Sequence, residues 1–547
     1  MAIITFPKKQ FEKEIGKLNE RMQEKVAMFG TPIEKIDNTE VHLEIFPNRP
    51  DMLSYQGFKR SFLSFLEKKK GLKQYTLNSP KKEYRVNIDS SVKNIRPYTA
   101  CAIVKGLKFD DEKIKEIVEI QEKLHLTIGR KRKKLAIGIY PLEKIKLPIT
   151  YKALEPDKIK FTPLESPREM SGLEILQKHP TGKEYAPLLS GKAKFPIFVD
   201  SNKEILSMPP IINSKLTGKI DKRTRDVFVE CSGDKLEILK KCLNIIVTAL
   251  ADMGGKIYQM KLNYGKTPDL KPEKMKISLE NTNKLLGLNL TEKQLKQYLE
   301  KMGHNYNNEQ VEIPSWRVDV LHEVDLIEDV AIGYGYENFI PEIPEISTIG
   351  NENPKETLNR KISQILAGLE MQEVSNFHLT TKESQFKKMG ISEKQEKAII
   401  EVENSKTDYN ILRKNLRHYL LKNFAENVDS EYPQKIFEIG KVFDLNEKTG
   451  KITEIERLAI AITPGNYTKV KQILEYLSKS IGIEFKFEEP DKKKTILIEG
   501  RVAQIKFNKE TIGYMGELHP KIIKNWKLKM PVALLEINLK EIYKKLI

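Results

Sequence analysis

The chain is divided by two proline-containing breaks, one at Thr267-Pro268 and one between Pro341 and Pro344. Proline interrupts helices and the interior strands of sheets, so these breaks should bound a compact unit over residues 268–344. With 547 residues, the chain is also too long for one hydrophobic core, because such cores stop growing beyond about 250–300 residues. The patterns of apolar residues predict an α+β multidomain protein with four regions, 1–90, 91–265, 268–344 and 350–547.

The four regions differ in their predicted elements. Residues 1–90 are expected to form a small α/β domain, and residues 91–265 a larger one. Residues 268–344 predict two helices, Leu279–Leu286 and 291–302, and then a short hairpin. A helix-turn-helix followed by wing-like strands is compatible with nucleic-acid binding and equally with a packing module. Residues 350–547 alternate helices with apolar strands, which predicts a large, mostly antiparallel sheet.

The net charge of +18 favours a polyanionic partner such as nucleic acid. A lysine-rich composition caused by genome bias or heat adaptation would give the same charge. No run approaches the roughly 18 apolar residues of a membrane span, and the N-terminal stretch lacks the hydrophobic segment of a signal peptide. The cysteines, Cys101, Cys231 and Cys242, show neither metal-binding nor disulfide spacing. A reducing, cytoplasmic location is therefore expected.

The segment from Trp316 to Phe339 concentrates acidic residues on an apolar helical pattern. Asp325, Glu328 and Asp329 stand at positions i, i+3 and i+4 and would share one helix face, and Asp319 lies just ahead of the helix. Converging carboxylates repel one another unless a cation lies between them, and such hard oxygen ligands suit Mg²⁺. The alternative is that acids near a helix N-terminus are favoured by the helix dipole and face water.

Two other segments have the features of a pocket wall. In L-S-M-P-P-I-I-N (206–213), two prolines fix an extended backbone, and a strand over 226–231 ends beside Ser232 with Glu230 near its end. Rigid loops beside strand ends suit a pocket, whereas capping of the core edge is the alternative. In P-N-R-P-D-M-L-S (47–54), Asp51 is expected to cap the next helix and could pair with Arg49.

Six motifs in order carry a resemblance over essentially the whole chain. They are P-N-R-P-D-M-L-S (47–54), H-L-T-I-G-R-K-R-K-K-L-A-I-G-I (125–139), L-S-M-P-P-I-I-N (206–213), R-V-D-V-L-H-E-V-D-L-I-E-D-V-A-I-G-Y-G-Y-E-N-F (317–339), F-E-I-G-K-V-F (437–443) and G-Y-M-G-E-L-H-P (513–520). Together they resemble the β subunit of phenylalanyl-tRNA synthetase in its archaeal and eukaryotic-like form. The four regions would then correspond to a B1-like domain, a B3/4-like editing domain, a B5-like domain and a B6/B7-like core.

The resemblance implies a subunit of a class II synthetase, assembled with an alpha subunit as an (αβ)₂ heterotetramer. That enzyme attaches phenylalanine to tRNA-Phe using ATP and Mg²⁺, and the ATP and phenylalanine sites lie on alpha. Residues 350–547 lack an F-R-x-E context for their arginines, so this chain alone is expected to be inactive in aminoacylation. The alternatives are a non-catalytic tRNA-binding or scaffold subunit without editing activity, and a free-standing nucleic-acid-binding regulator.

The resemblance also implies hydrolytic editing of tyrosine misattached to tRNA-Phe, in the region 91–265. Glu230 is the candidate partner of the tyrosyl hydroxyl, beside Ser232. The residues expected to line the pocket and position water are Leu206, Ser207, Pro209 and Asn213. No Ser/His/Asp or Cys/His nucleophile set is apparent, which is consistent with substrate-assisted attack by water. Tyr140-Pro141 stands where the family commonly has a His-Asp pair, which puts a role for that loop in doubt.

For the acidic segment, the resemblance implies an Mg²⁺ site at Asp319, Asp325, Glu328 and Asp329. Its expected role is structural, near the alpha subunit, rather than catalytic. Glu323 is expected to face the other side of the helix and to take no part.

Overall fold

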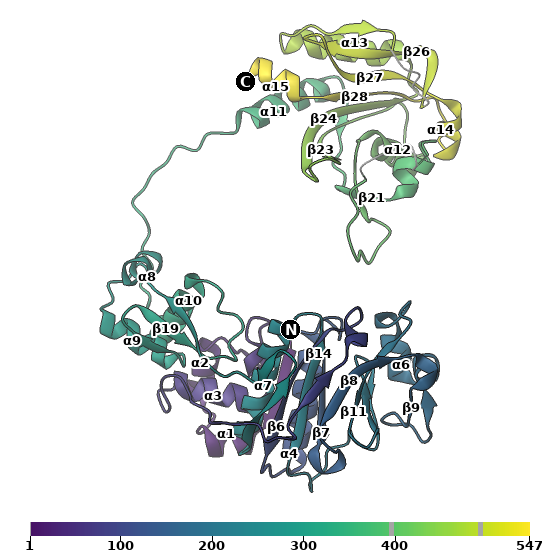
Figure 1. Ribbon diagram of the computed structural model, residues 1–547. Coiled ribbons are helices and arrows are strands. Elements are labelled where there is room, and N and C mark those ends of the chain that lie inside the picture. Colours follow the sequence, from purple (N-terminus) through teal and green to yellow (C-terminus); the bar gives the residue numbers. More distant parts are fainter. Residues whose placement is uncertain (1, 393–398, 491–495) are drawn as a thin grey trace. The chain divides into compact units, whose positions relative to one another are not determined.

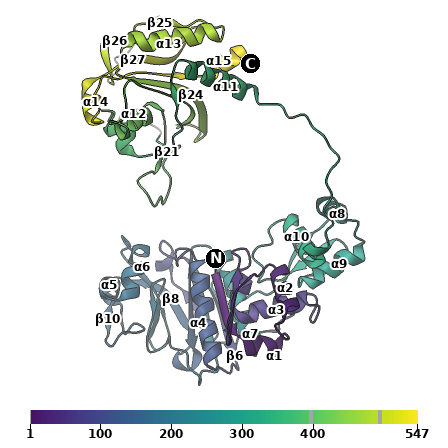
Figure 2. The same cartoon turned by 180° about the vertical axis from the view of Figure 1, so that it is seen from behind.

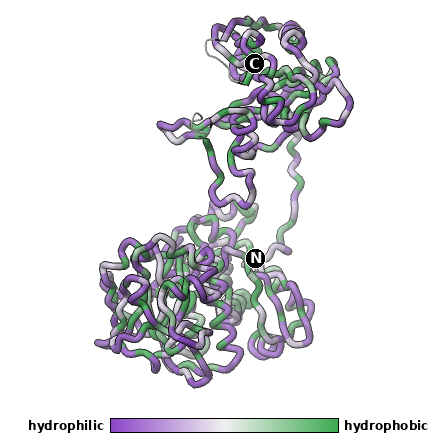
Figure 3. The backbone as a smooth tube through the Cα atoms, turned by 90° about the vertical axis from the view of Figure 1, so that its right-hand side faces the viewer, coloured by the Kyte–Doolittle hydropathy of each residue, from purple (hydrophilic) through white to green (hydrophobic). Residues whose placement is uncertain are grey.

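The computed structural model describes residues 2–392, 399–490 and 496–547. The chain forms two compact units, Met1–Ile343 and Pro344–Ile547 (Figure 1). The first three predicted regions pack together in the first unit, because one hydrophobic core runs from Phe6 through the central sheet to Trp316. No helix among the described residues is long and apolar enough to cross a membrane. Hydrophobic and hydrophilic residues alternate over short stretches of the trace in both units (Figure 3).

The N-terminal part of the first unit is a small antiparallel sheet covered by helices. Its strand order is β1-β3-β2. The elements are β1 (Ala2–Pro7), α1 (Lys8–Glu14), α2 (Glu20–Met28), β2 (Ile33–Ile36), β3 (Glu40–Ile45), η1 (Pro50–Met52) and α3 (Tyr55–Phe65). The expectation that Asp51 caps α3 is wrong, because the Ser54 side chain accepts the Gly57 N–H instead. Asp51 lies in η1 with both carboxylate oxygens on Arg49, which is the local pair that the sequence allowed.

The central part contains two sheets that pack face to face. One has the order β16-β15-β6-β14-β7, with β4 paired to β15, and the other has the order β13-β12-β11-β8-β5. Their strands are β4 (Leu77–Asn78), β5 (Val86–Ile88), β6 (Tyr98–Lys105), β7 (Leu135–Pro141), β8 (Ile149–Leu154), β11 (Phe195–Val199), β12 (Ile205–Met208), β13 (Ile212–Asn213), β14 (Val227–Gly233), β15 (Lys256–Leu262) and β16 (Gly265–Thr267). The helices α4 (Asp111–Leu126) and α7 (Leu236–Asp252) cover the outer face of the first sheet (Figures 1 and 2).

The central strand β14 is buried along its whole length. Successive side chains of a strand point to opposite faces. Val227 and Val229 therefore pack in the core under α4 and α7, whereas Phe228 packs against the second sheet with Tyr140 and Leu206. This alternation places Glu230 between the two sheets.

The last part of the first unit has the predicted order of helix, turn, helix and hairpin. Its elements are β17 (Glu273–Lys276), α8 (Leu279–Leu286), α9 (Glu292–Lys301), β18 (Asn305–Asn307), β19 (Gln310–Ile313) and α10 (Glu323–Tyr334). Ser278 caps α8, and Thr291 forms a capping box with Gln294 at α9, so local sequence alone specifies where both helices begin.

The second unit is built on a sheet of order β20-β23-β24-β28-β27-β26-β25, in which only the β20–β23 pair is parallel among the described strands. Its strands are β20 (Gln372–Glu373), β23 (Gln434–Leu445), β24 (Ile452–Thr463), β25 (Lys486–Glu488), β26 (Leu497–Phe507), β27 (Glu510–Leu518) and β28 (Ala533–Asn538). Residues of α11 (Pro354–Gly368), α13 (Tyr467–Ser480) and α15 (Lys540–Leu546) pack in one core with Leu458 and Ile460. Residues of α12 (Arg417–Glu426) and α14 (Pro520–Asn525) pack with Ala459 and Ala461 on the other face.

Candidate functional site

The tyrosine at position 140 joins three of the predicted pocket residues. Its hydroxyl oxygen lies 2.8 Å from Ser207 Oγ, 3.3 Å from Glu230 Oε1 and 3.4 Å from Asn213 Oδ1. Tyr140 is fully buried, and burial raises the pKa of its hydroxyl well above the usual value. A buried phenol requires a hydrogen-bond partner, so Tyr140 fixes the positions of Ser207, Asn213 and Glu230. Sequence reasoning had placed the role of this position in doubt.

A cavity of about 160 Å³ opens beside this network. Glu230, Asn213 and Pro209 line it, together with His125 and Arg132, which belong to the motif at 125–139 but were not among the predicted pocket residues. The volume is below the roughly 300–1,000 Å³ of pockets for drug-sized ligands, and it is in scale with a single amino-acid side chain. The cavity thus collects three of the six predicted pocket residues at one place.

The carboxyl group of Glu230 is the chemically distinctive part of the cavity wall. Its side chain is 1% exposed, and burial raises its pKa to about 8, so it is largely protonated at neutral pH. Oε1 faces Tyr140, while Oε2 is buried and has no partner with hydrogen-bond geometry among the described residues, although the Ser232 side chain acts to lower the pKa. A buried oxygen left without a partner has a free-energy cost, and a ligand hydroxyl would remove it.

The other predicted pocket residues lie close by but outside the cavity lining. Leu206 is fully buried in the hydrophobic core between the sheets, and Ser207 reaches the network through Tyr140. Ser232 is buried two residues after Glu230 on β14, on the same face of the strand.

Arg132 connects the helix α4 to the proline-containing loop. It donates hydrogen bonds to Ile211 O at 2.7 Å and to Glu122 Oε1 at 2.9 Å, and its guanidinium lies 4.4 Å from the centroid of the Tyr185 ring. His125 Nε2 accepts the Ile137 N–H at 2.8 Å. Since burial lowers the pKa of His125, the neutral imidazole anchors the edge of β7. Arg132 belongs to a run of five consecutive cations at positions 130–134, and it is the member of that run that lines the cavity.

The same run has a strained backbone. Arg130, Lys131 and Arg132 have φ angles of 46°, 53° and 62°, the left-handed region that costs residues with a Cβ about 1–2 kcal/mol each. Lys131 is exposed, so its side chain contributes little packing. We expect Lys131→Gly to stabilise the protein by up to about 1 kcal/mol, because the strain removed exceeds the added backbone entropy of glycine. Thermal unfolding will measure this change in stability. The control is Lys133→Gly, at an exposed position with ordinary φ, which should destabilise the protein. A lower melting temperature for Lys131→Gly would show that backbone strain at this position is not relieved by glycine.

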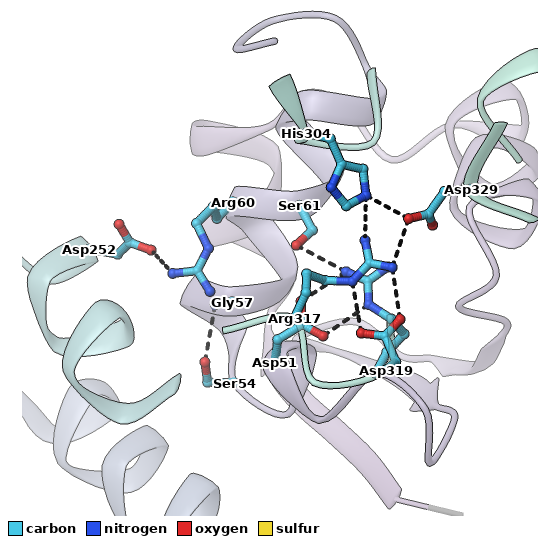
Figure 4. A network of polar contacts seen from close by, with 11 residues as sticks. Asp51, Ser54, Gly57, Arg60, Ser61, Asp252, His304, Arg317, Asp319 and Asp329 are labelled. Atoms are coloured by element: carbon cyan, nitrogen blue, oxygen red, sulfur yellow. Dashed lines mark hydrogen bonds and ion pairs between the residues drawn. The ribbon is translucent and has the colours of Figure 1, made fainter. Parts of the chain in front are cut away.

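The acidic segment is organised around a buried arginine. Arg317 donates from Nε to Asp319 Oδ1 at 2.9 Å and from Nη2 to Asp319 Oδ2 and Asp329 Oδ2, both at 2.8 Å (Figure 4). His304 Nε2 lies 2.7 Å from Asp329 Oδ2. Although burial acts to raise it, the pKa of Asp329 is held far below its usual value by Arg317 and His304. The cation between these two carboxylates is therefore a guanidinium, two residues from Asp319 in the sequence.

The other two predicted ligands have different surroundings. Asp325 Oδ2 accepts the backbone N–H groups of Leu321 and His322 at 2.8 Å each, which begins the helix α10. Glu328 as a residue is exposed. The pKa of its carboxyl group is nevertheless raised, first by the partial loss of water around it and then by the negative charges of Asp329, Asp325 and Asp319. Negative charge is therefore only partly compensated at Glu328.

Among the described residues, one group of at least three possible metal ligands has its ligand atoms within 4.8 Å of one another, and it consists of Asp37, Glu40 and His42. The four acids of the segment do not form such a group. Glu323 faces away as expected, accepting from Ser278 N at 2.6 Å and Asn281 Nδ2 at 2.8 Å. The magnesium assignment to Asp319, Asp325, Glu328 and Asp329 stays a prediction.

Comparison with known proteins identifies the family. The tRNA synthetase B5 domain model matches residues 275–336, and the phenylalanyl tRNA synthetase beta chain CLM domain model matches residues 340–539. With the winged helical unit and the large antiparallel sheet, these matches define a chain of an aminoacyl-tRNA synthetase. The phenylalanine–tRNA ligase beta subunit of Pyrococcus furiosus is 40% identical over 514 residues, covering 91% of this chain and 90% of that protein. The chain belongs to the family of phenylalanine–tRNA ligase beta subunits, which confirms the resemblance found in the sequence.

Further relatives and a solved structure agree. The beta subunit of Thermococcus sibiricus is 39% identical over 509 residues, 91% of this chain and 90% of that one. That of Methanosphaera stadtmanae is 35% identical over 564 residues, 99% of this chain and 100% of that one. A crystal structure of an N-terminal fragment of the Pyrococcus horikoshii phenylalanyl-tRNA synthetase beta subunit superimposes with a TM-score of 0.58 at 37% identity, covering 61% of this chain and 99% of the fragment.

Proposed function

We propose that this chain works in an (αβ)₂ phenylalanine–tRNA ligase of the cytoplasm, which charges tRNA-Phe with phenylalanine using ATP. In this proposal the aminoacylation site lies on alpha, and the present chain supplies assembly, tRNA contacts and hydrolytic editing of Tyr-tRNA-Phe. Its domains are 1–90, 91–265, 268–344 and 350–547, with editing in the second. The family membership and the chemistry of the cavity beside Glu230 support this assignment.

The observation that carries the editing role is the unpartnered Glu230 Oε2 on the wall of a cavity the size of one side chain. A synthetic pocket for phenylalanine rejects an analogue with one extra hydroxyl by only about 10²-fold. A second pocket with a buried polar atom reverses the preference, because tyrosine satisfies that atom and phenylalanine leaves it unpaired. Glu230 would therefore select tyrosine at the second site.

The residues present are suited to hydrolysis by water. Glu230 binds the tyrosyl hydroxyl, Ser207 holds Tyr140 in place beside it, and Asn213 on the cavity wall orients the substrate and a water molecule. Water adds to the ester carbonyl carbon, the bond to the ribose oxygen breaks, and that oxygen takes the proton that the water loses. The products are free tyrosine and tRNA, and no covalent intermediate with the protein forms.

The proposal is tested with the chain co-expressed with an alpha subunit. The expected result is a complex that charges tRNA-Phe and hydrolyses Tyr-tRNA-Phe much faster than Phe-tRNA-Phe, whereas the isolated chain does not charge tRNA. Charging without any hydrolysis of Tyr-tRNA-Phe would instead support the scaffold alternative. Failure to associate with alpha would overturn the assignment.

We further propose that Mg²⁺ binds the acidic segment through Asp319, Asp325, Glu328 and Asp329. The raised pKa of Glu328 supports this, because uncompensated negative charge gathers there, and oxygen donors suit the ion. The ion would supply compensating charge, while Arg317 holds Asp319 and Asp329 in place.

Magnesium should accordingly stabilise the chain. At ten times its dissociation constant, Mg²⁺ should add about 1.4 kcal/mol to the free energy of unfolding. Glu328→Gln should lose most of this increment, whereas Glu323→Gln, on the other side of α10, should retain it. Thermal unfolding with and without Mg²⁺ measures both, and an equal increment in the two variants would exclude Glu328 as a ligand.

A further inference from the structure

A second cavity lies in the first unit, away from Glu230, where three of the predicted regions meet. It has a volume of about 270 Å³. Its walls come from α3 and the segment after it, from the end of α7 at Asp252, and from the segments around Gly303 and Trp316. The proposed editing uses none of its lining residues, and the proposed metal site uses only Arg317, which holds Asp319 and Asp329.

The lining of this cavity is strongly cationic. Its basic members are Arg49, Lys59, Arg60, Lys69, Lys70, Lys73 and Arg317, and Asp252 is the one acid among the described residues that line it. Several of these cations have carboxylate partners just outside the cavity: Asp51 pairs with Arg49, Glu14 with Lys59, and Glu67 with Lys70. A count of cations alone therefore does not establish a binding site.

Arg60 is the residue that distinguishes the cavity. Its side chain is 6% exposed, and Nη1 donates to Asp252 Oδ2 and to the Tyr75 hydroxyl, both at 2.9 Å. The guanidinium carbon lies 4.4 Å from the Trp316 ring centroid. Nε and Nη2 are buried and have no hydrogen-bond partner among the described residues. Buried charged donors without partners are costly, so these two atoms require an acceptor that none of the described residues supplies.

The charge around Arg60 points to an anion. Asp252 forms ion pairs with both Arg60 and Lys73, so a single carboxylate balances two cations in this part of the cavity. Lys69, at the rim, is exposed and carries no ion pair with the described residues. Figure 4 shows Arg60 with Asp252 on one side and with Ser61 and Arg317, which line the same cavity, on the other.

We propose that this cavity binds the phosphate groups of a small, free phosphorylated ligand. Nε and Nη2 of Arg60 would donate side by side to two phosphate oxygens, the planar geometry that guanidinium groups offer to phosphate. Lys69 and Lys73 neutralise the remaining charge. A volume of 270 Å³ exceeds that of a single ion and accommodates two linked phosphate groups, so pyrophosphate is the probe of choice.

The test uses the full-length chain in complex with its alpha partner and measures binding of inorganic phosphate and pyrophosphate by calorimetry. Arg60→Lys keeps the charge and the pair with Asp252 but removes the fork, and Lys69→Gln changes an exposed side chain, so both variants should fold. Each should weaken pyrophosphate binding at least about tenfold, whereas Lys68→Gln, next to the rim but outside the lining, should bind normally. Circular dichroism and charging activity should stay unchanged in all three variants.

Two kinds of result would overturn the proposal. One is the absence of phosphate and pyrophosphate binding by the unaltered complex, or binding that neither Arg60→Lys nor Lys69→Gln weakens. The other comes from a parallel arm with tRNA-Phe: if both variants weaken tRNA binding and pyrophosphate neither binds nor competes, the cavity serves a phosphate of the tRNA backbone and not a free ligand.

Discussion

Replacing Arg317 with methionine should destabilise the first unit by about 3–5 kcal/mol, the range found when one partner of a buried ion pair is removed. The substitution keeps much of the side-chain volume but leaves Asp319 and the fully buried Asp329 without their guanidinium. His304 then becomes the remaining partner of Asp329. The cost arises mainly from the uncompensated carboxylates and much less from lost packing.

Tryptophan fluorescence measures this effect unit by unit. The chain has two tryptophans, Trp316 in the first unit and Trp526 in the second. In a Trp526→Phe background, unfolding in denaturant reports the first unit through Trp316, beside the altered residue. Arg85→Met, at an arginine outside this network, serves as the matched control and should cost under about 1 kcal/mol. A change of less than about 1 kcal/mol for Arg317→Met would show that the acids do not depend on this arginine.

The second large effect concerns Glu230. In the assembled enzyme, Glu230→Ala should lower kcat/KM for hydrolysis of Tyr-tRNA-Phe by about 10²-fold or more, because the tyrosyl hydroxyl loses its buried partner. Glu230→Gln keeps a group that can hydrogen-bond and should lose about tenfold. Charging of tRNA-Phe should not change in either variant. Glu237→Gln, at an exposed position on α7, is the control. An unchanged rate of Tyr-tRNA-Phe hydrolysis in Glu230→Ala would show that Glu230 does not bind the tyrosyl hydroxyl.

Stability against pH provides an independent check on Glu230. Its pKa is raised from 4.5 to about 8 in the folded chain, so the folded state binds this proton more tightly than the unfolded state. The stability contribution of the protonated group is present below about pH 4.5 and is lost as the pH rises toward 8, with a slope of up to about 1.4 kcal/mol per pH unit. Glu230→Gln should lack this loss. Glu116, whose pKa burial raises to about 7, contributes equally to the unaltered protein and to Glu230→Gln, so its contribution cancels in the comparison. If the stability of both proteins changed with pH in the same way, Glu230 would not be protonated in the folded chain.

Local patterns account for the parts of the structure that were predicted best. Caps at Ser278 and Thr291 specify α8 and α9, because a capping hydrogen bond joins residues within three positions. The capping role of Asp51 was wrong for a related reason: Arg49 and Ser54 are both near, and the ion pair and the serine cap satisfy the segment better. The spacing of the acids predicts that they share a helix face, but it does not reveal Arg317 as the partner of Asp319 and Asp329, because helical periodicity carries no information on the segment that folds against the helix.

The sequence by itself determined the proline-bounded segmentation, the capped helices and the family, since these depend on neighbouring residues or on motifs in a fixed order. Only the tertiary structure decided the face of β14 that carries Glu230, because both faces of that strand are buried and alternation alone does not distinguish them. It also decided the partners of Tyr140 on β12 and β13, and the meeting of Arg60 with Asp252 and Trp316. These contacts join residues from about 70 to more than 250 positions apart, which packing of the whole first unit brings together and no local pattern encodes.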